Sequence, residues 1–179
     1  MKTANRLILF SLLIIGMSAC SPRLTPFTQD LYSDNNWSEG ELKKIQFYLS
    51  RDIRLYRDFT EGSSKIEGGK IRMVKGRKVE EVVIPNGTPG LMVFSPKDDR
   101  LAVSFEDNDD RFLMFGPNKK IGERYVLLAK EWSRSRGKVS YEGTTWYTDS
   151  ESAYAALMVD LKKIKRTKVK SRVAEGRKL

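Results

Sequence analysis

Residues 101–115, LAVSFEDNDDRFLMF, are the stretch of the sequence that decides the fold. Apolar side chains alternate with other residues at Leu101, Val103 and Phe105, and this period of two is typical of a β-strand with one buried face. Residues 112–115 are apolar at every position, which is typical of a strand covered on both faces. The acidic residues between the two runs have the chemistry of a solvated turn. The stretch therefore predicts a β-hairpin.

Short runs with β-strand character continue along the chain on both sides of this hairpin. Most of the segments between them contain glycine, proline, asparagine or aspartate, which favour turns. Many short strands bounded by turns are typical of an antiparallel sandwich or small barrel. The expected strands are residues 51–57, 70–74, 78–84, 91–94, 101–106, 111–115, 124–129, 138–141 and 144–147. We therefore predict a mainly β protein, a single small antiparallel barrel or sandwich with one N-terminal helix.

The N-terminal helix is predicted over residues 39–49. Ser38 is a suitable N-cap, and Glu41 three residues later completes a capping-box pattern. From Leu42 onward, apolar residues recur at i, i+3 and i+7, which is helical spacing. Before this helix, residues 20–37 contain two prolines and the loop-forming run Asp-Asn-Asn, so they are predicted to form a tether.

The end of the chain allows two interpretations. Residues 150–164 have apolar positions at helical spacing after a capping-box pattern, and a helix there would make the fold α+β. The same stretch also holds apolar residues at a period of two, so its structure stays open. For residues 165–174 the alternation favours an extended conformation. The expected organisation is a β-rich domain over residues 38–160, followed by a basic segment, residues 161–179, that forms an edge strand or tail of the same domain.

The formal net charge of +10 is concentrated at one end of the chain. Residues 161–179 carry nine Lys and Arg against one acid, whereas residues 20–160 carry 22 of each sign. This distribution argues against a nucleic-acid-binding domain, which needs a broad basic face. The segment is instead a candidate contact for anionic lipid, cell-wall polymer or an acidic envelope protein, the alternative being a solvated basic edge. The candidate contact residues are Lys162, Lys163, Lys165, Arg166, Lys168, Lys170 and Arg172.

The first 19 residues have the organisation of a secretory signal. Lys2 and Arg6 precede an apolar run over residues 7–16, and the small residues Ser18 and Ala19 follow it. A helix of about ten residues rises only about 15 Å, which is too short for a hydrocarbon core of about 30 Å. The run therefore predicts a cleaved leader and not a transmembrane helix.

Residues 17–20, Met-Ser-Ala-Cys, resemble the lipobox of bacterial lipoproteins. The resemblance covers only residues 1–20 and implies cleavage between Ala19 and Cys20, with acylation of Cys20. Two or three acyl chains would hold a protein on a membrane effectively permanently. By the same resemblance, Ser21 in the place of an aspartate favours the outer membrane, and the lack of an acidic cluster directly after the cysteine favours an orientation towards the periplasm.

The sequence contains no histidine, and this absence excludes several classes of enzyme. No imidazole is available as a general base or metal ligand, and acylation of Cys20 would leave no thiol. Serine–histidine hydrolases, cysteine proteases and ordinary zinc enzymes are therefore excluded. The acidic turn at residues 106–110 lacks the glycine and the distant glutamate of an EF-hand loop. We predict no catalytic residue, no metal site and no cofactor.

Two hypotheses for the function follow. The favoured one is a membrane-anchored envelope lipoprotein that binds or scaffolds a partner near the membrane and is not a catalyst. The alternative is an enzyme of the cell envelope that uses carboxylates on glycans, which would need two carboxyl groups about 5–9.5 Å apart in one cleft. The carboxylates that could form such a pair are Glu80, Glu81, Glu106 and Asp107.

Overall fold

The computed structural model describes residues 23–58, 70–74, 77–97 and 99–167. Two antiparallel β-sheets make up most of these residues, so the predicted mainly β class is confirmed. Within the described residues neither sheet closes into a barrel, which agrees with the sandwich among the two predicted architectures.

The first sheet has seven strands in the order β1-β13-β2-β6-β7-β8-β9. Their bounds are β1 Leu24–Pro26, β13 Leu157–Asp160, β2 Phe47–Leu49, β6 Pro89–Lys97, β7 Arg100–Ser104, β8 Phe112–Asn118 and β9 Arg124–Leu127. The second sheet has six strands in the order β10-β11-β12-β3-β5-β4. Their bounds are β10 Glu131–Ser133, β11 Arg136–Tyr141, β12 Thr144–Asp149, β3 Ile53–Asp58, β5 Arg77–Ile84 and β4 Lys70–Val74.

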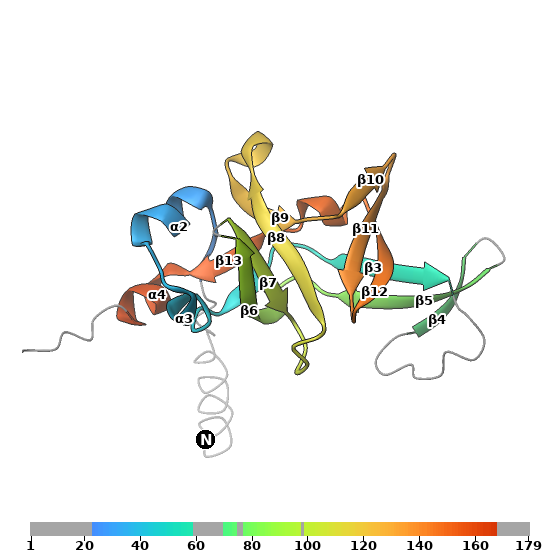
Figure 1. Cartoon of the computed structure of the whole chain (residues 1–179), viewed down its shortest axis with the longest axis horizontal. Coiled ribbons are helices and arrows are strands. Elements are labelled where there is room, and N and C mark those ends of the chain that lie inside the picture. Colours follow the sequence, from blue (N-terminus) through green and yellow to red (C-terminus); the bar gives the residue numbers. More distant parts are fainter. Residues whose placement is uncertain (1–22, 59–69, 75–76, 98, 168–179) are drawn as a thin grey trace, which may run out of the picture.

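Short helices complete the described chain. The α-helices are α2 Gln29–Asn35, α3 Glu39–Leu42 and α4 Leu161–Thr167, and the 3-10 helices are η1 Lys119–Ile121 and η2 Ser152–Tyr154. Figure 1 shows the three α-helices beside the seven-stranded sheet at one end of the long axis and the six-stranded sheet towards the other end. The two sheets meet where β8 lies against β11.

The β7–β8 hairpin confirms the prediction made from residues 101–115. Leu101 lies opposite Phe115 and Val103 lies opposite Leu113, and all four side chains are fully buried. Strand β8 has a neighbour on each side, as its apolar composition indicates. Its other face is only partly covered, because Met114 is half-buried. The hairpin therefore supplies one complete apolar face to the core.

The predicted helix over residues 39–49 is wrong after its first turn. The capping box forms, with the Ser38 N–H donating to Glu41 Oε2 at 2.9 Å, but α3 ends at Leu42. Strand β2 follows and pairs with β13 on one side and β6 on the other. Phe47 and Leu49 are buried with Tyr48 half-buried between them, so burial on a two-residue period overrides the helical spacing.

The predicted tether is also wrong for its described part, which is folded. Strand β1 pairs with β13, and Pro26 is tolerated there because β1 is an edge strand that needs no donor on its open side. Helix α2 begins after Thr28, whose side chain accepts a hydrogen bond from the Leu31 N–H at 3.2 Å. Phe27 and Trp37 are buried in the core. The prolines and the Asp-Asn-Asn run suggested a loop, but these two aromatic side chains determine the structure.

The ambiguous C-terminal region contains both kinds of structure. Strand β13 is extended, and α4 follows it directly. The extended conformation and edge strand predicted beyond residue 165 are therefore wrong for residues 165–167, and residues 168–174 lie outside the described chain. The helix forms because Leu161 and Ile164, three residues apart, both pack against the core.

No helix among the described residues combines the length and the apolar character that crossing a bilayer requires.

Replacing Phe27 with alanine tests whether the N-terminal segment belongs to the domain. We expect Phe27→Ala to lower the free energy of unfolding by about 3–5 kcal/mol, because it removes a fully buried ring from a packed core. The control Asp34→Ala changes an exposed residue of the same segment and should cost less than about 0.5 kcal/mol. Urea denaturation followed by circular dichroism measures both free energies of unfolding. If Phe27→Ala left the free energy of unfolding unchanged, the N-terminal segment would be a tether, as predicted from the sequence, and not part of the folded domain.

Candidate functional site

The predicted contact residues of the basic segment are only partly within the described chain. Lys162 and Lys163 lie on α4 and are exposed, and Lys165 and Arg166 belong to the same helix. The remaining predicted site residues lie outside the described residues; they are Ala19, Cys20, Lys168, Lys170 and Arg172.

Glu80 is held in an ion pair between strands of the six-stranded sheet. It is only 7% exposed, and Arg57 Nε donates to its Oε2 at 2.7 Å. Arg57 also donates from Nη1 to Thr144 Oγ1 at 3.1 Å, and its guanidinium carbon lies 4.4 Å from the centroid of the Trp146 ring. The pair thus connects β3, β5 and β12 and gives this carboxylate a structural role.

Glu81 follows Glu80 on the same strand and therefore faces the opposite side of the sheet. Arg54 Nη1 lies 3.9 Å from Glu81 Oε1. Adjacent strand residues cannot flank one bond of a substrate, so these two glutamates do not form the carboxylate pair that a glycan-acting enzyme would need.

Glu106 is the centre of a second cluster, which joins the two sheets. It lies between β7 and β8, accepts a hydrogen bond from the Tyr141 hydroxyl, and is 2.6 Å from Arg111 Nη1. Arg111 Nε is 2.8 Å from Glu142 Oε1 in the turn between β11 and β12. The hydrogen bond to Glu106 raises the pKa of the Arg111 guanidinium. Burial, reinforced by the Glu106 contact, raises the pKa of Tyr141, which therefore stays a donor.

Open pockets lie on both sides of the Glu106 cluster. One, of about 560 Å³, is lined by Arg111, Tyr141 and Glu142, and the other, of about 670 Å³, is lined by Asp107, Leu91 and neighbouring residues of β6 and β7. In the first pocket Arg111 is already paired with Glu142 and with Glu106, which lines the second pocket. Among the described residues, no group of three or more acidic or cysteine side chains is arranged to hold a metal ion.

An arginine stacked on two tyrosines forms a third cluster, on the solvent face of the six-stranded sheet. Tyr56 on β3 and Tyr147 on β12 are direct register partners, and their ring centroids are 6.1 Å apart. Arg136 on β11 places its guanidinium carbon 3.8 Å from the Tyr147 ring centroid and 5.2 Å from that of Tyr56. The neighbours Leu55 and Trp146 point to the opposite, buried face. We call Arg136, Tyr147 and Tyr56 the Arg–Tyr patch.

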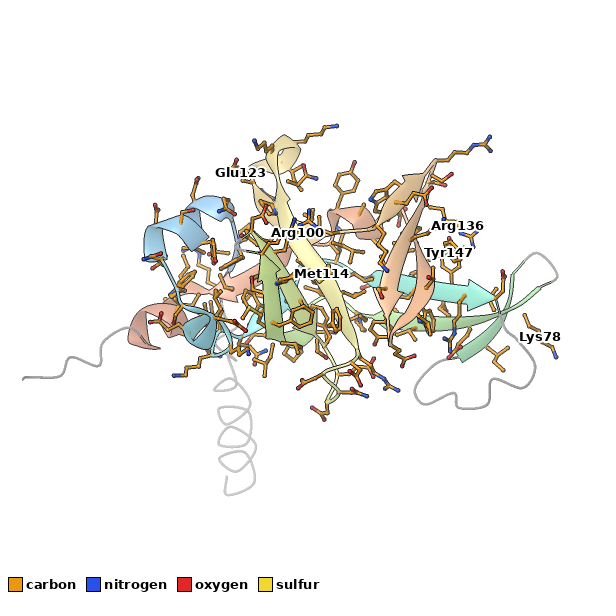
Figure 2. All side chains as sticks on the ribbon, viewed as in Figure 1. Lys78, Arg100, Met114, Glu123, Arg136 and Tyr147 are labelled. Carbon is orange, nitrogen blue, oxygen red and sulfur yellow. The ribbon has the colours of Figure 1, made fainter. Side chains whose placement is uncertain are left out.

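Arg136 differs from the other cations on this face because it makes no ion pair within the described residues. Lys138 Nζ is 2.7 Å from Glu131 Oε2, and Arg54 lies near Glu81. Stacking fixes the plane of the Arg136 guanidinium while its N–H donors face solvent. Figure 2 shows Arg136 and Tyr147 together, towards the end of the long axis opposite α4. Such an arginine is suited to bind a carboxylate by donating two N–H hydrogen bonds to its two oxygens.

Sequence reasoning missed this patch. Its three residues are separated by up to about ninety positions in the chain, and only the pairing of β3 with β12 brings them together. The available signal was local and incomplete: Lys138 begins the expected strand 138–141, whereas Arg136 lies two positions before it, in a segment expected to be a turn. In the structure β11 begins at Arg136, and this places both residues on one face.

Comparisons with protein-family models, with curated proteins and with solved structures find no significant match for this chain. Conclusions about its function therefore depend on the geometry of its own residues.

Removing the cation from the buried pair should destabilise the domain. We expect Arg57→Met to lower the free energy of unfolding by about 2–3 kcal/mol, because Glu80 stays buried without its hydrogen-bonded partner. The double variant Arg57→Met/Glu80→Met should recover most of this loss. Urea denaturation measures both, and the matched control Lys43→Met removes an exposed pair with Glu39 and should cost less than about 0.5 kcal/mol. Equal losses in test and control would contradict the structural role of Glu80.

Stability should fall at alkaline pH because two buried tyrosines resist ionisation. Burial raises the pKa of Tyr125 and Tyr141 above the unfolded value of about 10. Their contribution is therefore complete below about pH 10 and is lost as the pH rises, by about 1.4 kcal/mol per tyrosine at about pH 11. Between about pH 10 and pH 11, the free energy of unfolding obtained from denaturation curves should fall less in Tyr141→Phe than in the parent protein. An unchanged dependence would show that Tyr141 ionises freely in the folded protein.

Proposed function

We propose that this chain is a lipid-anchored protein of the bacterial cell envelope, on the periplasmic side of the outer membrane, and that its β domain is a non-catalytic binding module. The anchor rests on the signal-like leader and on Cys20 at its end. Strand β1 begins at Leu24, four residues after Cys20, so the linking chain spans at most about 14 Å. A lipid at Cys20 would hold the domain directly against the membrane surface.

The Arg–Tyr patch is the observation that favours a binding role. Tyrosine and arginine are enriched among the residues that dominate the energetics of protein interfaces. A guanidinium already oriented by two rings loses little further freedom when it meets a carboxylate. The glutamates considered for catalysis are instead held by Arg57, Arg54 and Arg111. The partner that suits this surface is an envelope protein that presents a carboxylate to Arg136.

Site-specific photocrosslinking in a bacterial host tests the proposal. A photoreactive residue at Thr145 lies on the exposed face of β12, two positions from Tyr147. We expect it to form a discrete crosslinked product with a protein in the membrane fraction. Arg136→Glu and Arg136→Lys should each reduce that product at least about tenfold, because both remove the bidentate contact. Intact-mass analysis of the same preparation should show an acylated Cys20 as the first residue.

Two outcomes would contradict the proposal, one for the lipid anchor and one for the Arg–Tyr patch. An unmodified thiol, or a leader still attached, would remove the anchor. A product from Thr145 that does not depend on Arg136 would remove the patch as the contact surface. The same photoreactive residue at the exposed Lys120 on η1 is the matched control and should give no such product.

A further inference from the structure

The outer face of strands β6, β7 and β8 is apolar at its centre. The other face of these strands packs in the core, through Leu101 and Val103 of β7 and their partners on β8. Since side chains alternate along a strand, Ala102 and Ser104 lie on the outer face together with their register partners. The pairing arranges these residues in two rows across the three strands. The rows are Phe94, Ala102 and Met114, and Leu91, Ser104 and Phe112.

The large side chains of these rows are open to solvent. Leu91 is 50% exposed, and Phe94, Phe112 and Met114 are half-buried. The two phenylalanine rings meet edge to face, with centroids 5.0 Å apart. A contiguous apolar surface of aromatic, leucine and methionine side chains is typical of the centre of a protein interface.

The end of the outer face at the β6–β7 turn is basic. Lys97 and Arg100 are register partners, and both are exposed without an ion pair among the described residues. Arg100 lies two positions before Ala102 and therefore belongs to the same face, and Figure 2 shows it above Met114 on these strands. Asp99 in the same turn contributes to the raised pKa of Tyr125, which lies on the core side of the sheet. The turn thus places two cations beside the apolar rows.

The opposite end, at the loop between β7 and β8, is acidic. Asp107 and Asp109 of this loop line the 670 Å³ pocket together with Leu91. Both carboxylates are exposed, and neither makes an ion pair in the part of the chain that the structure describes. Lys43 lines the same pocket and already lies 3.0 Å from Glu39 Oε1. The loop thus places two carboxylates at the end of the face remote from the cations.

We propose that this outer face is the interface of a homodimer, with a second copy of the chain packed against it. A two-fold axis that lies in the interface and runs across the strands sets the strands of the two copies antiparallel. The apolar rows then meet at the centre, and the cations of each copy lie against the carboxylates of the other, so that the same charge contact occurs twice. The interface belongs to the seven-stranded sheet and leaves the Arg–Tyr patch free, so the inference goes beyond the proposed function.

Photocrosslinking of the full chain in a bacterial host tests the dimer. A photoreactive residue replaces Leu91, and two copies of the chain with different tags are expressed together. We expect a crosslinked product that carries both tags. Lys97→Glu/Arg100→Glu in both copies should reduce this product at least about tenfold, because acids then face acids at both ends of the interface. Asp107→Lys/Asp109→Lys in both copies should have the same effect, because cations then face cations.

Co-expression of the two charge variants, each with its own tag, separates a lost contact from a lost fold. In the mixed pair every charge contact again joins opposite signs, because one copy is acidic at both ends and the other is basic at both ends. We therefore expect the product with both tags to return to within about twofold of the parent level. This recovery requires both variants to be folded.

Two matched controls accompany these variants. The change Asp30→Lys/Asp34→Lys reverses two exposed carboxylates on α2, outside the outer face, and should leave the product unchanged. A photoreactive residue at Thr145, on the six-stranded sheet, should give no product with both tags. Absence of the product from Leu91, a product unaffected by the charge reversals, or no recovery in the mixed pair would overturn the proposal. A product that joins Leu91 only to a different protein would also overturn it.

Discussion

The burial of Phe27 is the contact on which the arrangement of this protein depends. Its ring is fully buried, with centroids 4.9 Å from Tyr125, 5.2 Å from Phe47 and 5.9 Å from Trp37. Its backbone N–H donates to the Leu157 carbonyl, and its own carbonyl accepts from the Tyr125 N–H, each at 2.9 Å. One residue therefore connects the N-terminal segment to β13, the neighbour of edge strand β1, and to β9, the strand at the other edge of the same sheet. The antiparallel register of β1 with β13 places the start of β1 at Leu24 opposite the end of β13 at Asp160.

The parts of the fold that were predictable are those determined by residues close in sequence. The hairpin from Leu101 to Phe115 needs only alternation and a polar turn, and both are local. Residues 47–49 follow helical spacing equally well, and only their two neighbouring strands make them extended, from positions more than 40 residues away. The same holds for the folded segment around Phe27, because its partners Tyr125 and Leu157 are distant in the chain.

The candidate sites also divide into those that the sequence could predict and those that depend on the fold. Composition identified the basic segment, since charge density can be read without knowing the fold. It could not show that this segment begins beside residue 24, which depends on the β1–β13 register. The glutamates were chosen by residue type, and their arginine partners come from other strands or turns. The Arg–Tyr patch was not predictable, because it requires the register between β3 and β12.

The link between β2 and β3 has a mechanical consequence. Only residues 50–52 separate these strands, so the chain passes directly from one sheet to the other. Ser50 secures this crossing by two contacts with Ala156, its N–H donating to the carbonyl and its Oγ accepting from the N–H, each at 2.9 Å. A pull between the Arg–Tyr patch and the chain entry would load Tyr56, β3, the crossing, β2, β13 and β1 in turn. The load would pass between the neighbouring strands β2, β13 and β1 through their backbone hydrogen bonds. These bonds would be loaded in shear, so they would resist the force together and would not break one after another.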